Sequence, residues 1–450
     1  MNLLVFTPVI RSSAIGRMAA LVVHALTASG HEVSVVRTEK DGFSGSAAHD
    51  FACRPVSWTD RPAVTALAGS ADACIYQIGD NEEFHRGCLE WMPRFPGLVS
   101  LHDIFLGNLF FGWAEGRRDE AEENLRFWYG AVAAQAFFSA AAAGDFIEQT
   151  RCVSPMTEWI CAMARGVIIH SGFGADRVLA SCPGPVYQVP LPVERPALPA
   201  GRPEARPAGD DRFRVLTVGH VNPNKRAESV IRAIGSSETL RARTVYRLVG
   251  KVAPARRVHL ADLAETSGVM LEISGEVDNA NLAGAFAEAD VACCMRWPSL
   301  EGASGSTIEA MLWGKPAIVS NTGFYSELPG DCVIKIDPED EVASCCAALE
   351  RLHGDQGERR RIGEAARAWA EQVFSPANYA ENLVGMARET NRLRPVFATL
   401  EGISRTLKRW RATEELLSLE ETLAPLELLT GSDQPSCSKW REARLSNLST

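Results

Sequence analysis

The order of strands and helices that opens the chain starts again after residue 212, and this repetition constrains the fold most. Near the N-terminus, "NLLVFTPVI" predicts a buried strand, "AIGRMAALVVHALTASG" an amphipathic helix and "HEVSVV" the next strand, which together form a βαβ unit. Further buried strands are expected at "ACIYQIG", "GLVSLHD" and "GVIIHS". The first part of the chain therefore predicts a parallel, doubly wound α/β sheet.

The segment 196–212, "PALPAGRPEARPAGDDR", has four prolines and no hydrophobic period, which is typical of a linker. After it come strand "FRVLTVG", helix "AESVIRAI" and strands "TVYRLVG", "VMLEISG", "DVACCM" and "PAIVS". A chain of 450 residues exceeds one ordinary core, so we expect two α/β domains, 1–195 and 213–375. Residues 376–450 predict a helix packing back on the first domain and a helical tail. Ligands of such sheets bind at the carboxyl ends of the strands, in the cleft.

Composition narrows the possible partners and surroundings. The formal charge of −10 and the absence of a long Lys/Arg run argue against nucleic acid. Residues 1–10 lack a basic segment and a cleavage site, so we expect no signal peptide. The twelve cysteines include no CxxC pair, which favours buried thiols in a reducing cytoplasm over a zinc site.

Two segments bear on membranes. The apolar stretch 131–143, "AVAAQAFFSAAAA", is shorter than the about 20 residues that span a bilayer, so we expect a core helix there. The basic run "RTLKRWR" in the tail could touch a membrane surface or an acidic partner, although a solvated helix face is the commoner arrangement.

Two glutamates, Glu301 and Glu309, stand eight positions apart in "EGASGSTIEAMLWGKP". The spacing alone means little, because 56 acidic residues give about seven such pairs at any offset. The context is more informative, since Gly305, Ser306 and Thr307 open a helix directly after a buried strand. The unpaired N–H groups of that first turn predict an anion site. The alternative is an ordinary capped helix with solvated glutamates.

A second cluster is "GHVNPNKR", which follows strand "FRVLTVG". Lys225 and Arg226 lie at or near a helix start, where the helix dipole disfavours a cation by about 0.3–1 kcal/mol. A bound diphosphate would compensate for this. The alternative is two exposed basic residues in a loop.

Together these motifs resemble a known family. The order "VGHVNPNKR", "LVGK", "ISGEVDNANLAGAFAEADVACCM", "EGASGSTIEAMLWGKPAIVSNTG" and "SELP" is similar to that of the retaining glycosyltransferases of the large family 4, the glycosyl transferases group 1. In the first domain, "YQIGDN" and "SLHDIF" resemble the acceptor-side half of the same fold. The resemblance covers residues 1–393 and implies the GT-B fold, in which two Rossmann-like domains face a cleft.

The resemblance also implies roles for single residues. Glu301 would accept hydrogen bonds from the donor sugar, Glu309 would hold the nucleotide ribose, and the Gly305–Thr307 turn would bind the diphosphate together with Lys225. His102, which by default is a structural histidine, would contact the donor sugar near the reacting carbon.

Four further positions are implied by the same resemblance. The backbone of Gly16 would approach the sugar and the diphosphate, and Gly275 with Glu276 would pack around the base. One departure stands out, because the family has an arginine where this chain has His220. Arg226 or Arg296 would then have to supply the second phosphate clamp.

The sequence therefore predicts transfer of a sugar from a UDP-type or GDP-type donor to a saccharide or small-molecule acceptor, with retention at the anomeric carbon and no further cofactor. No DxD motif is present, so no metal is expected. Two alternatives remain open at this point. One is a sugar-nucleotide epimerase or phosphorylase on the same fold, and the other is a non-catalytic nucleotide-sugar-binding subunit, which His220 favours.

Overall fold

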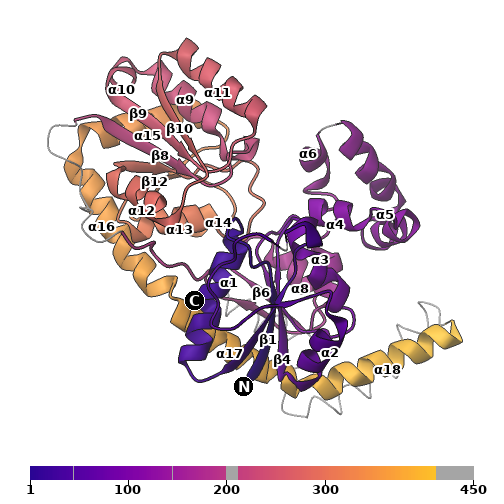
Figure 1. Ribbon diagram of the computed structural model, residues 1–450. Coiled ribbons are helices and arrows are strands. Elements are labelled where there is room, and N and C mark those ends of the chain that lie inside the picture. The colour runs from indigo at the N-terminus through magenta and orange to yellow at the C-terminus, as the bar shows by residue number, and fades with distance from the viewer. Residues whose placement is uncertain (44, 144, 199–210, 412–450) are drawn as a thin grey trace.

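Two parallel sheets form the framework of the protein in this computed structural model, which describes residues 1–43, 45–143, 145–198 and 211–411 (Figure 1). The first sheet has seven strands in the order β3-β2-β1-β4-β5-β6-β7. These strands are β1 (Asn2–Thr7), β2 (Glu32–Arg37), β3 (Val56–Ser57), β4 (Ala73–Ile78), β5 (Leu98–Leu101), β6 (Gly166–Ile169) and β7 (Val186–Gln188).

Helices cover both faces of this sheet, as the parallel connections require. The helices of this domain are α1 (Ala14–Ala28), α2 (Arg61–Ser70), α3 (Glu82–Trp91), α4 (Gly107–Trp113), α5 (Arg118–Ala143), α6 (Phe146–Thr150), α7 (Thr157–Met163) and α8 (Ala175–Ser181), with a short 3₁₀ turn, η1 (Asp41–Phe43). The expected βαβ unit at the N-terminus is confirmed, since β1 pairs in parallel with β2 across α1.

The second sheet has six strands in the order β10-β9-β8-β11-β12-β13. Its strands are β8 (Phe213–Val218), β9 (Thr244–Val249), β10 (Met270–Gly275), β11 (Val291–Cys293), β12 (Ala317–Ser320) and β13 (Val333–Ile336). Around them lie η2 (Pro223–Lys225), α9 (Ala227–Ser236), α10 (Glu238–Arg243), α11 (Pro254–Ser267), α12 (Asn279–Glu288), α13 (Gly305–Leu312), α14 (Phe324–Glu327), α15 (Glu341–Gly354) and α16 (Gln356–Val373). The expected α/β class with two parallel sheets is confirmed.

The chain returns to the first domain through α17 (Pro376–Arg392), which packs against α1. The hydroxyl groups of Tyr379 on α17 and Ser100 on β5 lie 3.0 Å apart, and Tyr379 is 1% exposed. After α17 comes α18 (Arg394–Trp410), which extends away from the body of the molecule (Figure 1). The linker expected at 196–212 and the tail lie mostly outside the described residues.

One expectation about the first domain is wrong in part. The stretch 131–143 is helical, as predicted, but it belongs to α5, which bends at Gly130 and stands out from the domain with α6 (Figure 1). Only one face is buried, with Phe137 fully covered and Val132 84% exposed. None of the helices in the described ranges combines the length and apolar character that a bilayer crossing requires.

The anchoring of α17 can be tested at Tyr379. We expect Tyr379→Phe to lower the free energy of unfolding by about 0.5–1.5 kcal/mol, through loss of one hydrogen bond. Tyr379→Ala should cost about 3–5 kcal/mol, because it also leaves a cavity between α17 and the sheet. Urea unfolding followed by circular dichroism measures both. Phe127→Ala, at a side chain that is 77% exposed, is the matched control and should change little. Equal effects at the two positions would contradict the anchoring role.

Candidate active site

The candidate site lies where the carboxyl ends of the two sheets meet. The loop between β11 and α13 runs directly along the end of β5. The amide of Ile104 donates to the carbonyl of Leu300 at 2.8 Å, and the amide of Gly302 donates to the carbonyl of His102 at 2.7 Å. The hydroxyl of Ser171, after β6, donates to the carbonyl of Gly302 at 2.6 Å. The first domain therefore frames the loop that carries Glu301.

The start of α13 is capped and faces open space. Ser304 caps the helix, because its hydroxyl accepts from the amide of Thr307 at 3.4 Å and from the Thr307 hydroxyl at 3.0 Å. A side chain added at Gly305 would meet no atom within 4 Å, so open space faces this turn. Ser306 stands beside the cap, with its hydroxyl 3.3 Å from that of Ser304. The free N–H groups and the helix dipole thus point toward accessible space.

Two donors hold the Glu301 carboxylate in place. Its Oε1 accepts from Nε of Arg296 at 2.9 Å and from the hydroxyl of Tyr325 at 2.7 Å. Arg296 is 5% exposed and Tyr325 is fully buried, so both donors are fixed by packing. No local pattern in the sequence points to Tyr325, which lies on α14, beyond the next strand.

Lys225 lies in the same cluster. It is 8% exposed, and its ammonium donates to the carbonyl of Val218. Burial, together with the charge of Arg296, lowers the pKa of Lys225 to about 7, while the charge of Glu301 opposes this effect. Gly219 leaves room for the ammonium, because a Cβ there would lie 2.5 Å from Nζ. A neighbouring anion would therefore favour the charged form of this lysine.

Glu309 is paired across the domain boundary. It is 2% exposed, and Nη2 of Arg17 donates to its Oε1. Burial raises the pKa of Glu309, and the Arg17 cation opposes the rise. Arg17 directly follows Gly16, and a Cβ added at Gly16 would lie 2.5 Å from the carbonyl oxygen of Pro8. The start of α1 thus packs tightly on the β1–α1 loop and directs Arg17 at the cleft, a role that sequence reasoning missed.

His102 and Asp103 end β5 at the cleft. Nε2 of His102 lies 2.8 Å from Oε1 of Gln77, which places the ring proton on Nε2. Burial lowers the pKa of His102 well below its ordinary value, and His170 lowers it further, so the ring is neutral. Burial, together with the charge of Glu301, raises the pKa of Asp103 to about 7. The hydrogen bond from the Asp80 amide opposes this rise.

Two other positions border the cluster. His220 is exposed, and its pKa is lowered by partial burial and by the charges of Lys251 and Lys225. Lys251, from the "LVGK" motif, is thus a further cation at this edge that sequence reasoning did not single out. Gly275 ends β10 with φ of 73° and accepts from the amide of Gly250 at 2.8 Å, and the exposed Glu276 follows it.

Arg226 lies apart from the cluster. Its guanidinium binds the buried Glu341 through three hydrogen bonds of 2.8, 2.9 and 3.0 Å. Of the two arginines expected as replacements at the phosphate position, Arg296 is the one that lies beside Lys225 and Glu301.

A cavity of about 340 Å³ opens next to the Glu301 loop. Its walls come from both domains, with Ile104, Phe105 and Phe173 on one side and Ser299 and Leu300 on the other. The loop residues immediately before Glu301 therefore face a space large enough for a small ligand.

The second domain matches a family model. The model described as glycosyl transferases group 1 matches residues 202–369. Over 121 residues, the chain is 35% identical to the MMP α-(1→4)-mannosyltransferase of Mycolicibacterium hassiacum. This match covers 26% of the chain and 28% of the mannosyltransferase, so the chain spans less than a third of that relative.

Solved structures resemble the whole architecture. Sucrose-phosphate synthase from Thermosynechococcus elongatus has a TM-score of 0.62 at 16% identity, covering 86% of this chain and 98% of the synthase. HepE of Anabaena, in complex with UDP and glucose, has a TM-score of 0.57 at 14% identity, covering 86% of this chain and 100% of HepE. A glycosyltransferase from Rickettsia africae has a TM-score of 0.58 at 12% identity, covering 86% of this chain and 98% of that glycosyltransferase. The chain therefore has the GT-B fold, with a second domain that matches the glycosyl transferases group 1 model.

Proposed function

We propose that this protein transfers a sugar from a nucleoside diphosphate sugar to an acceptor hydroxyl, with retention at the anomeric carbon. One observation carries the proposal. Lys225, Arg296 and the open start of α13 share the cleft with the carboxylates of Glu301 and Glu309. A diphosphate needs cations and N–H donors, whereas sugar and ribose hydroxyls need acceptors, and a nucleotide sugar presents both within one molecule.

The comparisons support the donor class. HepE has been solved with UDP-glucose, and the curated relative is named a mannosyltransferase. A UDP-type or GDP-type donor fits the same cluster, because both carry the ribose and the diphosphate. In our proposal the carboxylate of Glu309 accepts hydrogen bonds from the ribose hydroxyls. The ribose then either replaces Arg17 as its donor or shares the carboxylate with Arg17.

The bond from the anomeric carbon to the diphosphate oxygen breaks, and a bond from that carbon to the acceptor oxygen forms. The acceptor proton passes to the departing diphosphate. The transition state has oxocarbenium character, with negative charge growing on the leaving group. Lys225, Arg296 and the N–H groups of α13 stabilise that charge without rearrangement, because burial and hydrogen bonds already fix them.

Glu301 positions the sugar in this mechanism. Arg296 and Tyr325 both bind its Oε1, so the carboxylate is oriented before the donor arrives. His102 is neutral and therefore adds no positive charge beside the developing oxocarbenium ion. The acceptor enters through the 340 Å³ cavity that is lined by Leu300, the residue before Glu301.

Two alternatives are separated by one incubation. An epimerase converts a nucleotide sugar with no acceptor present, and a binding subunit leaves it unchanged under every condition. A transferase consumes the donor at a rate that depends on the acceptor. Chromatography of UDP-sugars and GDP-sugars, with and without a panel of saccharide acceptors, distinguishes the three.

The two glutamates should differ in calorimetry. Glu309→Ala should weaken both UDP and the UDP-sugar, because both ligands contain the ribose. Glu301→Ala should leave UDP affinity nearly unchanged but weaken the UDP-sugar, with each lost charge-assisted hydrogen bond worth about 1.5–3 kcal/mol. Glu339→Ala, at an exposed site, is the control. If Glu301→Ala weakened both ligands equally, the assignment of Glu301 to the sugar would be wrong.

Diphosphate binding should depend on pH through Lys225. In the protein without ligand the pKa of Lys225 is about 7, and a bound diphosphate raises it. Above pH 7 the binding of UDP therefore takes up a proton. As the pH rises in this range, the affinity for UDP falls by up to about tenfold per pH unit. Calorimetry of UDP binding near pH 8, in buffers with different ionisation enthalpies, measures the uptake. Lys225→Met should abolish this proton uptake and weaken UDP binding at lower pH. Unchanged proton uptake in this variant would exclude Lys225 as the titrating group.

Transfer should survive chelation. In our proposal the cations Lys225 and Arg296 stabilise the leaving group, so we expect turnover to stay within about twofold after EDTA treatment. Steady-state rates before and after dialysis against EDTA test this. Loss of turnover that Mg²⁺ or Mn²⁺ restores would show that a metal supplies the charge instead.

A further inference from the structure

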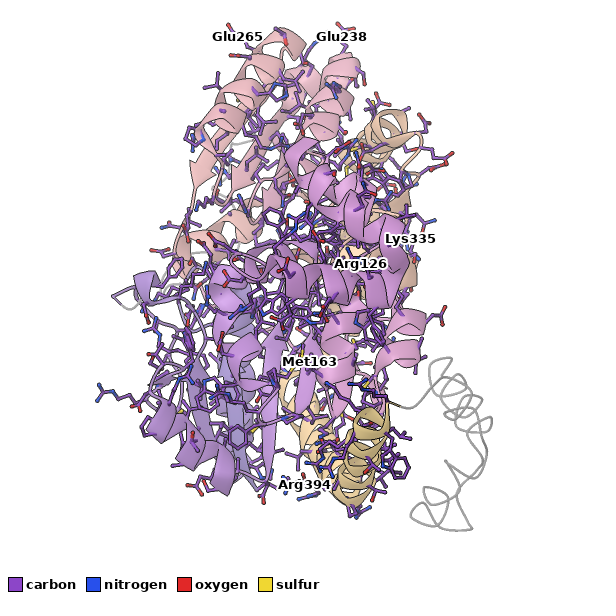
Figure 2. The ribbon with its side chains drawn as sticks, turned by 90° about the vertical axis from the view of Figure 1, so that its right-hand side faces the viewer. Arg126, Met163, Glu238, Glu265, Lys335 and Arg394 are labelled. Carbon is purple, nitrogen blue, oxygen red and sulfur yellow. The ribbon has the colours of Figure 1, made fainter. Side chains whose placement is uncertain are left out.

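A second cavity lies at the edge of the first sheet that is opposite to the cleft. It has a volume of about 330 Å³ and is lined by residues at the starts of β4 and β5, by the end of α2 and by α17 and α18. The cleft, in contrast, lies beyond the ends of the same strands. Arg394, in this cavity, is at the far end of the molecule from Glu238 and Glu265 of the second domain (Figure 2).

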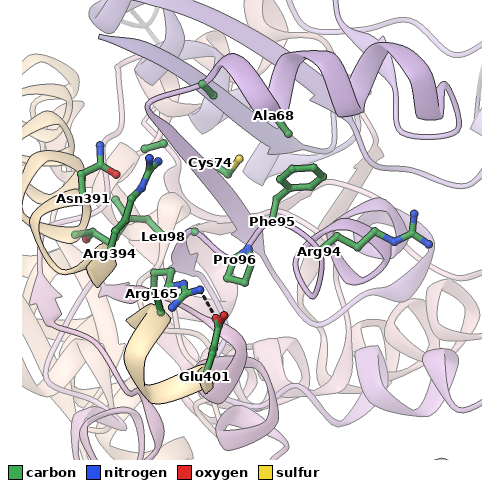
Figure 3. A pocket seen from close by; sticks show the side chains of 15 residues that line it. Ala68, Cys74, Arg94, Phe95, Pro96, Leu98, Arg165, Asn391, Arg394 and Glu401 are labelled. Atoms are coloured by element: carbon green, nitrogen blue, oxygen red, sulfur yellow. Dashed lines mark hydrogen bonds and ion pairs between the residues drawn. The ribbon is translucent and has the colours of Figure 1, made fainter. Parts of the chain in front are cut away.

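One part of the cavity wall is apolar. It is formed by Ala68, Cys74, Phe95, Pro96 and Leu98 (Figure 3). Leu98 is 1% exposed and Cys74 is 8% exposed, so this wall is continuous with the core of the domain. A ligand here would therefore bury apolar surface.

The other part of the wall is strongly positive. Arg94, Arg165 and Arg394 line the cavity, and Glu401 is the one carboxylate among the lining residues. Figure 3 shows Arg165 and Arg394 toward one side of the cavity and Arg94 toward the other. The cavity thus has three cations and one anion, in a chain whose formal charge is −10.

The contacts of these arginines leave the positive charge incompletely balanced. Arg165 is paired with Glu401, which is 54% exposed, and lies over the ring of Phe397 at 4.5 Å. Nη2 of Arg394 donates to the backbone carbonyl of Asp72 at 2.7 Å, which is a neutral partner. A solvent-exposed ion pair is weak and can be exchanged for a better anion.

We propose that this cavity is an accessory site for an organic oxyanion, a phosphate ester or carboxylate on an apolar body. The oxyanion binds Arg165 and Arg394, whose planar forks match carboxylate and phosphate oxygens. The apolar body lies against Phe95 and Leu98. The ligand joins the first domain to α17 and α18, which line the cavity on the other side.

The test uses the full chain and three probes: phenyl phosphate, octanoate and inorganic phosphate. Each is titrated by calorimetry with and without excess UDP, so that binding in the cleft is recognised as the part that UDP removes. We expect phenyl phosphate or octanoate to bind once per chain in both conditions, and inorganic phosphate to bind at least tenfold more weakly. Binding that UDP removes, or equally tight binding of inorganic phosphate, would overturn the proposal.

Variants locate the site. Arg394→Ala and Arg165→Ala should each weaken the organic probes at least tenfold, whereas Arg405→Ala, at an exposed arginine of α18 outside the cavity lining, should not. Ala398→Trp keeps every arginine but fills the cavity, so it should abolish binding even if an arginine variant folds poorly. Unchanged binding in Ala398→Trp, or no saturable binding by the unaltered protein, would refute the site.

Discussion

The cleft depends on compensation between buried cations and buried carboxylates. Lys225, Arg296 and Glu309 are each at least nine-tenths covered, and a charge in that setting is stable only with a partner. Arg296 is paired with Glu301 and Glu309 with Arg17, while Lys225 donates to the backbone carbonyl of Val218 and has a lowered pKa. The cluster is thus stable without a ligand and has one cation whose charge an incoming anion would stabilise.

The pairing also joins the two domains. Glu309 belongs to the second domain and Arg17 to the first, and the loop that holds Glu301 is hydrogen-bonded to the end of β5. The geometry around both glutamates therefore belongs to neither domain alone. Helix α17 strengthens this dependence, because it leaves the second domain and packs against α1, the helix that carries Arg17.

The two edges of the first sheet have different chemistry. At the carboxyl edge, backbone groups and charged side chains of both domains meet in compensated pairs. At the amino edge, three arginines face one exposed carboxylate over an apolar wall. In a parallel sheet all strands begin at one edge and end at the other, so the two sites are separated by the length of the strands, about 3.3 Å per residue. One sheet can therefore hold a reaction site and an accessory site without overlap.

The sequence by itself determined the two-sheet architecture, the positions of most strands and the helix that starts at Gly305, because periodicity and helix-start signals act over a few neighbouring residues. It did not reveal β3, β7 or β13, which have only two, three and four residues, or the exposed face of α5, whose alanines and phenylalanines resemble a core pattern. Arg226, the next residue after Lys225, forms an ion pair with Glu341 and does not join the cluster around Lys225. The pairs of Glu301 with Tyr325 and of Glu309 with Arg17 join positions 24 and 292 residues apart. Only tertiary structure decided them, because no local pattern records which side chains of distant elements meet, either within one domain, as for Glu301 and Tyr325, or between two, as for Glu309 and Arg17.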